Sequence, residues 1–599
     1  MLAVSSSDLP TPILSHSPRL TPVGPAEPPS RACSDQQFFE SIPPAADPFV
    51  ELYHNPSKLN ADVFDRLLSL LPNHELSPYV SVPNQIREGF HLGINIPVVE
   101  LYFPPNASMS PAEVAAVDEG IRQDVLKRRL AGPYDPLWLA QTLGILFRSS
   151  PLSCRRKYTP PGKPQKLRTI ENLSFPYSPT PGGTRSVNSN LSSDDYPSRW
   201  TRLSTLLDAV RRLPRDTTVL VTDLTDAFKQ LPIHPSQRPH HGVHWRGKLF
   251  FRKTPSFGGR TTPGTFCNVV DCVLDIVEFL FPALFTSNIV DDLLFARFNH
   301  TAVSSDMLFS VLRELGVEWS AEKTQTWSRR FKFGGVWIDM DEMTVELDGE
   351  KKRKYALKLE QFVEGRARDG KRLDDVLSIM GTLLYVCEII PARRPCLNAF
   401  LSWRRKFPTS TMSSRHLTRV VLDELDDWLC FLYNPEPLKA SFALPPTISR
   451  HYFFTDACSR GLGIVVDGRY AVGFVLSERW AEYAARPGNI AAPEAWAVEV
   501  VGAIIEALGI ENVAILVGVD NTNVVNAFAK GRAANRLVNN AIRRLSESMR
   551  QRDVILFLRY VNTKDNPADA VSRGFIDPRL SPFPIPLPLP PGTEAGPCP

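Results

Sequence analysis

Two groups of carboxylates in the sequence have the surroundings that metal-dependent chemistry requires. The first comprises Asp223, which ends the β-branched run TTVLVTD (217–223), and the pair Asp291 and Asp292, inside the apolar run SNIVDDLLF (287–295). Phosphoryl transfer to a nucleotide needs two divalent cations, and such cations bind carboxylates that rigid elements bring together. A single aspartate at a strand end is usually a turn residue or a helix cap, so each acid alone is a weak signal.

The second group lies in the last third of the chain and contains four acids: Asp456, Glu494, Asp520 and Asp569. Asp456 and Asp520 end predicted strands, Glu494 stands in the first turn of a predicted helix, and Asp569 follows a loop near the start of another. Four acids at element ends suit a second two-metal site, which would cleave a phosphodiester. Separate surface acids are the alternative for any one of them.

The elements around the first group predict a mixed α and β fold. The run 287–295 indicates a hairpin with acids at its tip. A Gly-rich stretch (256–266) and an amphipathic helix (Val269 to Phe285) separate it from the strand 217–223. Acids at every third or fourth position form a polar stripe on this helix, so we expect no membrane span.

The second group belongs to a compact α/β domain of about 125 residues. Its predicted strands are 451–456, 462–466, 469–476, 512–520 and 554–561, and its predicted helices are 493–509 and 536–550. Asp467-Gly468 between two of these strands is a strong hairpin signal.

The two ends of the chain are rich in proline. Residues 1–45 and 578–599 each hold nine prolines, so we expect a flexible leader and a passive tail; a polyproline ligand at 583–591 is the less favoured alternative. Residues 46–147 are expected to be mostly helical. The capping box Ser110-Pro-Ala-Glu113 begins a helix that should end near Gly132.

Composition limits the class of protein. The chain has 599 residues, of which 43% are hydrophobic and 22% charged, which excludes a wholly disordered or fibrous protein. The nine cysteines form no CxxC pair, so we expect no zinc knuckle. An odd number of scattered cysteines fits a reducing compartment. The N-terminus does not resemble a signal peptide. We therefore expect an intracellular protein of the cytoplasm or nucleus.

Several motifs, in order, resemble those of reverse transcriptases. VTDLTDAFKQLPIHP (221–235), PSFGGRTTPGTF (255–266) and NIVDDLLF (288–295) resemble the first palm motif, the second motif and the aspartate-pair motif. ELGVEWSAEKTQ (314–325) and FKFGGVWID (331–339) resemble the next two, and KLRTIENLSFP (166–176) resembles the fingers segment. The resemblance covers about 155–340.

The resemblance implies a role for each matching residue. Asp223 and Asp291 would hold two Mg²⁺ ions, with Mn²⁺ as an alternative, and Asp292 would be a less direct partner. Leu224 would offer its backbone carbonyl, and Lys323 stands at the family's lysine position. Ile289 departs from the family, in which an aromatic residue is usual; this puts primer contact in doubt but not metal binding.

The same resemblance identifies the residues that would bind the incoming nucleotide. Arg168, with Lys163 or Lys166, would bind the triphosphate, and Lys157 is a further candidate. Seven basic residues and no acid occur in 148–168, so an ordinary solvated loop is the less favoured alternative. Phe228 matches the bulky gate that excludes a ribose 2′-OH. Phe257 and Gly258 would lie near the nucleotide and the template.

Four segments of the C-terminal domain resemble the motifs of retroelement ribonuclease H, which cuts RNA in an RNA–DNA hybrid. They are FTDACSRGLGIVV (454–466), APEAWAVEVV (492–501), VGVDNTNVVNAF (517–528) and NPADAVSRG (566–574). Glu494 is preferred to its rival Glu499 because E-x-x-A fits the family's pattern. Asn521 and Asn566 are candidate assisting residues. Many relatives carry a histidine before the last aspartate, which VNTKDNPAD (561–569) lacks.

Basic segments after the palm would bind nucleic acid. Residues 351–372 carry nine basic residues against three acids, in the place of a thumb helix that holds template–primer. A solvated helical face is an equally weighted alternative for residues 351–372. For the cluster Trp403 to Lys406 the solvated face is favoured, and added stacking and charge toward nucleic acid are the less favoured alternative.

Several short segments outside the polymerase motifs, less specific than those motifs, resemble the DIRS-type retroelements, which integrate with a tyrosine recombinase. They are EGFHLGINIP (88–97), AGPYDP (131–136), RSSPLSCRRK (148–157), SVNSNL (186–191) and IPARRP (390–395). An LTR-type or pararetroviral relative is the next choice. The chain has no aspartic-protease or integrase signature, so a recombinase and a capsid-like protein would be separate partners.

Together these observations predict an α+β multidomain protein with a right-hand polymerase (fingers, palm, thumb) followed by an α/β ribonuclease H-like domain. The predicted parts are a disordered leader (1–45), a mostly helical region (46–147), fingers and palm (148–345), thumb and connection (346–440), the ribonuclease H-like domain (450–575) and a disordered tail (576–599). The predicted function is RNA-directed DNA polymerase with ribonuclease H activity, whose partners are dNTPs, RNA or DNA template–primer and RNA–DNA hybrid, with no membrane. The alternatives are a decayed or domesticated copy that binds nucleic acid without catalysis, and an RNA-dependent RNA polymerase, which Phe228 and the attached nuclease disfavour.

Overall fold

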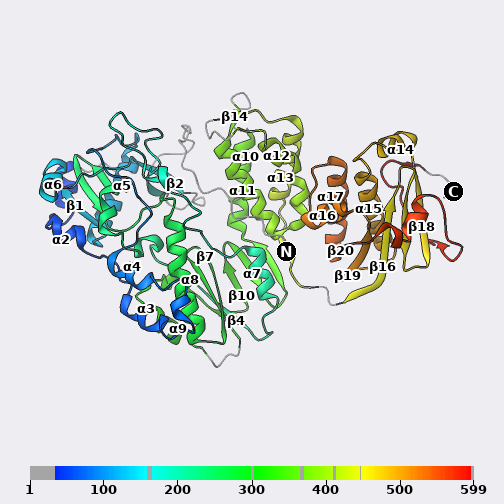
Figure 1. Cartoon of the computed structure of the whole chain (residues 1–599), viewed down its shortest axis with the longest axis horizontal. Coiled ribbons are helices and arrows are strands. Elements are labelled where there is room, and N and C mark those ends of the chain that lie inside the picture. The colour runs from blue at the N-terminus through cyan, green and yellow to red at the C-terminus, as the bar shows by residue number, and fades with distance from the viewer. Residues whose placement is uncertain are drawn as a thin grey trace. The chain divides into compact units, whose positions relative to one another are not determined.

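The computed structural model describes residues 34–157, 165–298, 303–364, 370–408, 413–444 and 447–594. The chain divides into two compact units, one on each side of the Gly334–Gly335 bond (Figure 1). We call their described parts the N-terminal unit (34–334) and the C-terminal unit (335–594). Both units combine helices with sheets, so the protein is an α+β multidomain protein.

A four-stranded antiparallel sheet lies at the centre of the N-terminal unit. Its order is β7 (Leu284–Ile289), β8 (Asp292–Arg297), β4 (Thr218–Asp223) and β9 (Gln325–Ser328). Helix α8 (Thr262–Leu280) packs its apolar residues into the same core as β4 and β8, next to β7 in Figure 1. The hairpin predicted over 287–295 is confirmed as the β7–β8 connection.

The region 46–147 belongs to the same compact unit as the segments that follow it. Strand β1 (Leu130–Tyr134) pairs with β6 (Lys248–Arg252), which pairs with β5 (Gly242–Trp245). Its helices are α2 (Pro48–Tyr53), α3 (Ala61–Leu68), α4 (Val82–Glu88), α5 (Pro111–Leu126) and α6 (Pro136–Leu143). The boundary expected at 147 therefore does not separate two folded bodies.

Two local predictions in this region need correction. The capping box of Ser110 and Glu113 is confirmed, but α5 ends at Leu126 rather than near Gly132. Residues 130–134 form β1 instead, because pairing with β6 satisfies their backbone groups. Helix α1 (Asp35–Glu40) lies inside the expected leader and buries Phe38 in a core with Val117 and Trp245, so that part of the leader is ordered.

The fingers segment forms a two-stranded antiparallel hairpin. Strand β2 (Leu152–Lys157) pairs with β3 (Lys166–Glu171), and Arg155 lies opposite Arg168. The remaining elements of the unit are η2 (His74–Leu76), η3 (Val187–Asn190), α7 (Leu203–Val210), η4 (Ala227–Gln230), η5 (Pro235–His240), α9 (Ser305–Glu314), η6 (Ala321–Lys323) and β10 (Arg330–Phe333).

The C-terminal unit begins with strands and a group of helices. Its strands are β11 (Val336–Asp339), β12 (Thr344–Leu347), β13 (Lys371–Arg372), β14 (Ser414–Arg415) and β15 (Lys439–Ser441). Its helices are α10 (Gly349–Glu364), α11 (Leu373–Ile389), η7 (Pro391–Leu397), α12 (Asn398–Arg404) and α13 (Arg419–Tyr433). Residues 351–364 of the basic segment thus lie in α10.

A mixed sheet forms the rest of the C-terminal unit. Its order is β20 (Ile555–Tyr560), β19 (Ala514–Val519), β16 (Ile448–Ala457), β17 (Gly461–Val466), β18 (Tyr470–Leu476) and β21 (Ser581–Pro582). The helices are α14 (Glu478–Ala484), α15 (Ala491–Ala507), α16 (Thr522–Lys530), α17 (Arg536–Gln551) and α18 (Ala568–Ser572), with the short η8 (Thr563–Asp565). The hairpin predicted at Asp467-Gly468 is confirmed between β17 and β18.

Alternation along the strands puts different helices on the two faces of this sheet. Ile464 and Val466 of β17 pack into the core that contains α15 and α17, whereas Val465 between them packs with Ala568 and Val571 of α18. Two packed faces hold the strand ends near α15 and α18 in fixed positions.

The proline-rich tail was expected to be disordered, but residues 576–594 pack on the sheet. Strand β21 pairs with Tyr470 and Ala471 of β18, and β22 (Thr593–Glu594) pairs with the other end of the same strand. The ring of Phe583 packs edge-on against Tyr470. The high proline content suggested disorder, but proline is compatible with an edge strand, which is where the tail pairs.

No helix among the described residues is long and apolar enough to cross a membrane.

Candidate active sites

Strand pairing brings the first group of carboxylates together. In the antiparallel pair β4–β8, Asp223 lies directly opposite Asp292. Asp291 lies in the turn that connects β7 to β8, next to Val290, whose φ is 59°. The backbone N–H of Leu224 donates to the carbonyl of Asp291 over 2.8 Å. The end of β4 and the β7–β8 turn are therefore adjacent.

The charges at this turn influence one another. Burial raises the pKa of Asp291, the negative charge of Asp223 raises it further, and the cations Lys323 and Arg168 partly offset both effects. The Nζ atom of Lys323, at the end of η6, donates to Oδ2 of Asp223 over 2.6 Å, and this bond raises the pKa of Lys323. A carboxylate whose pKa is raised by burial and by a second acid is stabilised in its ionised form by a cation.

Three aromatic rings, including that of Phe228, form a cluster. The centroid of the Phe228 ring, in η4, lies 5.4 Å from that of Phe257 and 5.2 Å from that of Phe266. Phe257 is 47% exposed, so this group opens to solvent on one side. The structure thus brings Phe228 and Phe257, both predicted to lie near the nucleotide, into one cluster.

A buried asparagine that we did not predict as functional holds the loop that follows Phe257. Asn188 donates from Nδ2 to the carbonyl of Gly258 over 2.9 Å and accepts from the backbone N–H of Arg260 over 3.0 Å. Gly258 has a φ of 115°, which favours glycine. Asn188 lies within SVNSNL (186–191), but nothing in that segment indicates its distant partners.

The predicted triphosphate-binding residues are described only in part. Arg168 is exposed on β3, and its charge acts on Asp291. The backbones of Lys157 and Lys166 pair across the β2–β3 hairpin. Lys163 lies outside the described residues, as do the side chains of Lys157 and Lys166.

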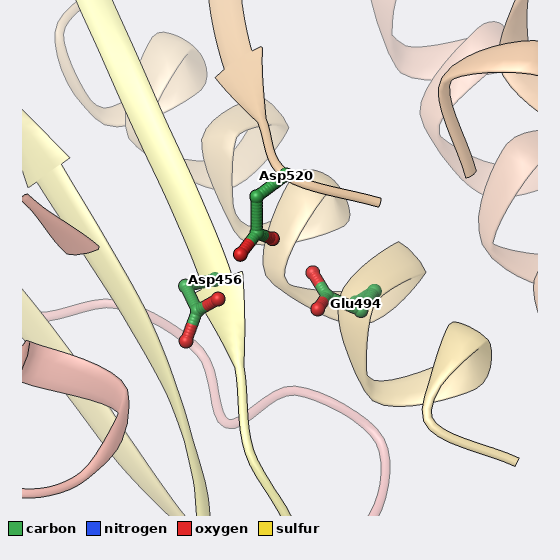
Figure 2. A group of neighbouring side chains, drawn as sticks. All are labelled: Asp456, Glu494 and Asp520. Carbon is green, nitrogen blue, oxygen red and sulfur yellow. The ribbon is translucent and has the colours of Figure 1, made fainter. Parts of the chain in front are cut away.

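Three members of the second group converge in the C-terminal unit. Oxygen atoms of Asp456, Glu494 and Asp520 all lie within 4.8 Å of one another. Figure 2 shows the three carboxylates turned toward one another, Asp456 from β16, Asp520 from the end of β19 and Glu494 from α15. The parallel pairing of β16 with β19 explains why Asp456 and Asp520 are neighbours. Thr455 pairs with Val519, and the residue that follows each of them is an aspartate.

This cluster has the electrostatics of a cation site. Asp456 and Glu494 are 3% and 4% exposed. Burial, together with repulsion from Asp520 and Asp569, raises the pKa of Asp456 to about 6, and burial with repulsion from Asp456 and Asp520 raises the pKa of Glu494. Oε2 of Glu494 and Oδ1 of Asp520 are buried without a hydrogen-bond partner among the described residues. Divalent cations of the Mg²⁺ type take such oxygen ligands, so these residues fit the predicted metal site.

The structure distinguishes the two candidate glutamates of α15. Glu494 points into the cluster, whereas Glu499 binds the guanidinium of Arg544 on α17, with 2.7 Å between Oε2 and Nη2. The E-x-x-A spacing therefore selected the glutamate that lies with the aspartates.

The fourth predicted acid lies near the cluster but outside the group of three. Asp569 is in α18 and pairs with Arg573 over 2.8 Å, although its charge still acts on Asp456. The hydroxyl of Ser572, one turn later, donates to Asp456. We did not predict Ser572, whose serine in NPADAVSRG carries no separate signal.

The two candidate assisting asparagines have structural roles. Asn566 is buried and donates to the carbonyl of Thr455 over 3.0 Å, immediately before Asp456. Asn521 accepts from the backbone N–H groups at the start of α16. Asn566 therefore supports the strand end that carries Asp456, and Asn521 caps a helix.

The less favoured interpretation of Trp403, stacking on nucleic acid, is wrong. Its side chain is buried, its ring packs with Phe400 and Phe407, and its Nε1 donates to the carbonyl of His416 over 2.9 Å. Trp403 therefore belongs to the core of the helical group rather than to a solvated face.

Comparisons with known proteins find similarity at the level of structure. No family model matches the chain, and no curated protein matches it. A foamy viral protease–reverse transcriptase in complex with double-stranded DNA is 15% identical over 84% of this chain and 81% of that chain, with a TM-score of 0.40. The foamy viral protein in complex with RNA/DNA hybrid is 14% identical over 83% of this chain and 62% of that chain, with a TM-score of 0.39. A third structure, of the foamy viral protease–reverse transcriptase in complex with dsDNA, is 15% identical over 84% of this chain and 97% of that chain, with a TM-score of 0.39.

Proposed function

We propose that the chain is the RNA-directed DNA polymerase of a retroelement. The observation that carries the proposal is the pairing of β4 with β8, which sets Asp223 against the Asp291–Asp292 turn. Two carboxylates held in this way suit a pair of divalent cations. The ordered motifs of 155–340 support the same assignment, with residues 148–345 as fingers and palm and 346–440 as thumb and connection.

The residues of this site would share the work of nucleotide addition. Asp223 and Asp291 would hold two Mg²⁺ ions, or Mn²⁺, which supply charge stabilisation when bound. Asp292 and the carbonyl of Leu224 would assist at the same strand ends. Arg168, with Lys163 or Lys166, would bind the triphosphate, because a guanidinium matches phosphate oxygens.

Sugar selection follows from the aromatic cluster. Phe228 contacts Phe257 and Phe266, so its ring has little freedom to move away from an incoming ribose 2′-OH. The polymerase would therefore prefer dNTPs to rNTPs.

Purified full-length protein with a primed RNA template tests this proposal. We expect extension with dNTPs that requires Mg²⁺ or Mn²⁺, and much weaker extension with rNTPs. Salt-dependent binding of template–primer without extension in either metal would instead support a copy that binds nucleic acid without catalysis.

We further propose that the C-terminal domain is a ribonuclease H. The convergence of Asp456, Glu494 and Asp520 carries this proposal, because it places buried, unpartnered carboxylate oxygens within reach of a common cation. Asp569, whose charge acts on Asp456 and which pairs with Arg573, would be the fourth ligand. The metal supplies an activated water and stabilises the leaving oxygen.

The nuclease proposal predicts a defined substrate. Cleavage should occur in the RNA strand of an RNA–DNA hybrid and not in double-stranded DNA of the same sequence. Equal cleavage of both duplexes, or of neither in Mg²⁺ and Mn²⁺, would contradict it.

Among retroelements we propose a DIRS-type origin. The segments EGFHLGINIP (88–97) and IPARRP (390–395) support it. A tyrosine recombinase and a capsid-like protein would then be separate products of the same element. Sequencing of the neighbouring reading frames tests this origin, and an integrase of the LTR type there would contradict it.

A further inference from the structure

The short helix that carries Phe228 is held on both sides of that residue. Asp226, which precedes η4, has a φ of 54°, an unusual conformation for a residue with a side chain. Gln230, at the end of η4, is buried and donates from Nε2 to the carbonyls of Thr225 and Glu318, each over 2.8 Å. The backbone around Phe228 is therefore held by side-chain hydrogen bonds in addition to the backbone bonds of the short helix η4.

Residues of the N-terminal region 46–147 provide the charged part of this support. Asp226 accepts from Lys127 over 2.8 Å and also from Arg129. On the other side of Phe228, the Nζ atom of Lys229 donates to both carboxylate oxygens of Asp124, over 2.7 and 2.9 Å. Asp124 lies in the last turn of α5, and Lys127 and Arg129 follow it within five residues, so a single segment of chain supports η4 on both sides of Phe228.

The same carboxylate connects this helix to the fingers hairpin. Asp124 accepts from Nη1 of Arg252 over 2.9 Å, and Nε of Arg252 donates to Glu171. Glu171 ends β3, the strand that carries Arg168. Asp124 is therefore shared between the element with the proposed sugar gate and the strand with the proposed triphosphate ligand.

The centre of the network is buried. Asp124, Arg252 and Glu171 are each at most 6% exposed. Burial opposes the charge on Asp124, but the positive charges of Arg252 and Lys229 outweigh it and lower the pKa of this carboxyl. Removing one charge from such a network leaves its partners buried and unpaired, which is costly and displaces them.

We propose that Asp124 is a positioning residue for sugar selection: through Lys229 it fixes η4, and hence the ring of Phe228, at the distance that admits a deoxyribose and excludes a ribose. This inference rests on the proposed polymerase function. It also assigns a role to the region 46–147, which supplies the support without contributing a side chain to the metal site.

Asp124→Asn is the central variant, because the amide keeps the shape of the side chain and removes its charge. We expect incorporation of rNTPs relative to dNTPs to rise about tenfold, which is smaller than the roughly hundredfold effect that a misplacement of about 1 Å can have on a reaction. Lys229→Met, a milder change at a partly exposed residue, should shift the same ratio in the same direction and leaves the Asp124–Arg252 pair in place.

Asp118→Asn is a matched control on the same helix. Asp118 is also a buried aspartate of α5 and also pairs with an arginine, Arg246, over 2.8 Å, but among the described residues it makes no hydrogen bond or ion pair with residues 226–230. If loss of any buried ion pair in α5 loosened the site, Asp118→Asn would change sugar selection as much as Asp124→Asn. We expect it to keep the wild-type ratio.

Combining Asp124→Asn with Phe228→Ala tests whether Asp124 acts on sugar selection through the ring of Phe228. Once the ring is absent, Asp124→Asn should add no further change to the ratio, and this non-additivity is the signature of positioning. Retained dNTP incorporation reports in every variant that the N-terminal unit, which contains all of these residues, has folded.

Failure of the proposed role of Asp124 and failure of the proposed polymerase function would give different results. Wild-type protein that incorporates no nucleotide would overturn the polymerase proposal. If the wild-type protein is active and the sugar ratio is unchanged in both Asp124→Asn and Lys229→Met, only the role of Asp124 is overturned. The same holds if Asp124→Asn changes the ratio equally in the wild-type protein and in Phe228→Ala. If Asp124→Asn fails to fold, the Lys229→Met ratio decides.

Discussion

The ammonium group of Lys323 lies 2.6 Å from the carboxylate of Asp223, at the end of the strand that also faces Asp292. The negative charges of Asp223, Asp291 and Asp292 all raise the pKa of Lys323, so it remains a cation at neutral pH. It occupies the same carboxylate that the proposed metal ions need, and the two kinds of cation repel each other.

Removing this cation should therefore strengthen metal binding. In Lys323→Met, the Mg²⁺ concentration that gives half-maximal extension should fall about threefold, the size expected for loss of one nearby charge at an exposed site. Lys248→Met, at the start of β6, is the control and should leave the Mg²⁺ requirement unchanged. A higher Mg²⁺ requirement in Lys323→Met would show that the lysine assists metal binding instead of competing with it.

The two glutamates of α15 provide a matched pair for the nuclease. Glu494→Gln removes a charge from the carboxylate cluster and should lower hybrid cleavage by at least about a hundredfold, the scale of losing a metal ligand's support. Glu499→Gln only breaks an ion pair with Arg544 and should leave cleavage within about twofold, because partly exposed pairs contribute little. Equal losses in both variants, measured at saturating Mg²⁺, would remove Glu494 from the site.

Glu424 should make the stability of the C-terminal unit depend on pH. Burial raises the pKa of its carboxyl to about 7, although it accepts from the backbone N–H groups of Ala399 and Phe400. The folded state thus favours the neutral form, so this contribution to the free energy of unfolding is complete below the ordinary pKa near 4.5 and is lost as pH rises through about 7.

Urea unfolding between pH 5 and 8 measures this contribution. The free energy of unfolding of Glu424→Gln should lose less on going to pH 8 than that of the wild type, by on the order of 2 kcal/mol. Asp423→Asn, at an exposed position of the same helix, should keep the wild-type slope. Parallel curves for Glu424→Gln and the wild type would mean that Glu424 does not titrate in this range.

Local patterns in the sequence were enough to predict the strand ends that carry Asp223, Asp456 and Asp520. The Asp467-Gly468 hairpin and the Ser110 capping box were predicted for the same reason, because a few neighbouring residues determine each of them. The choice of Glu494 over Glu499 depended on a family resemblance, since both glutamates lie on one helix.

Features that depend on distant partners were not predictable. The end of α5 is set by the pairing of β1 with β6, and the proline-rich tail is ordered by the edge of β18. The indole of Trp403 is buried by Phe400 and Phe407, and the support of Phe228 comes from Asp124, 105 residues from its partner Lys229. None of these contacts leaves a periodic or local signal.

The central claim is that Asp223 and Asp291 hold a common pair of divalent cations, and Asp291→Asn tests it most directly. The measurement is dNTP incorporation on a primed RNA template in Mg²⁺, with hybrid cleavage followed in the same preparations and Asp456→Asn as the reciprocal variant. The account predicts that Asp291→Asn loses incorporation and retains cleavage, while Asp456→Asn loses cleavage and retains incorporation. Incorporation at the wild-type rate by Asp291→Asn would contradict it.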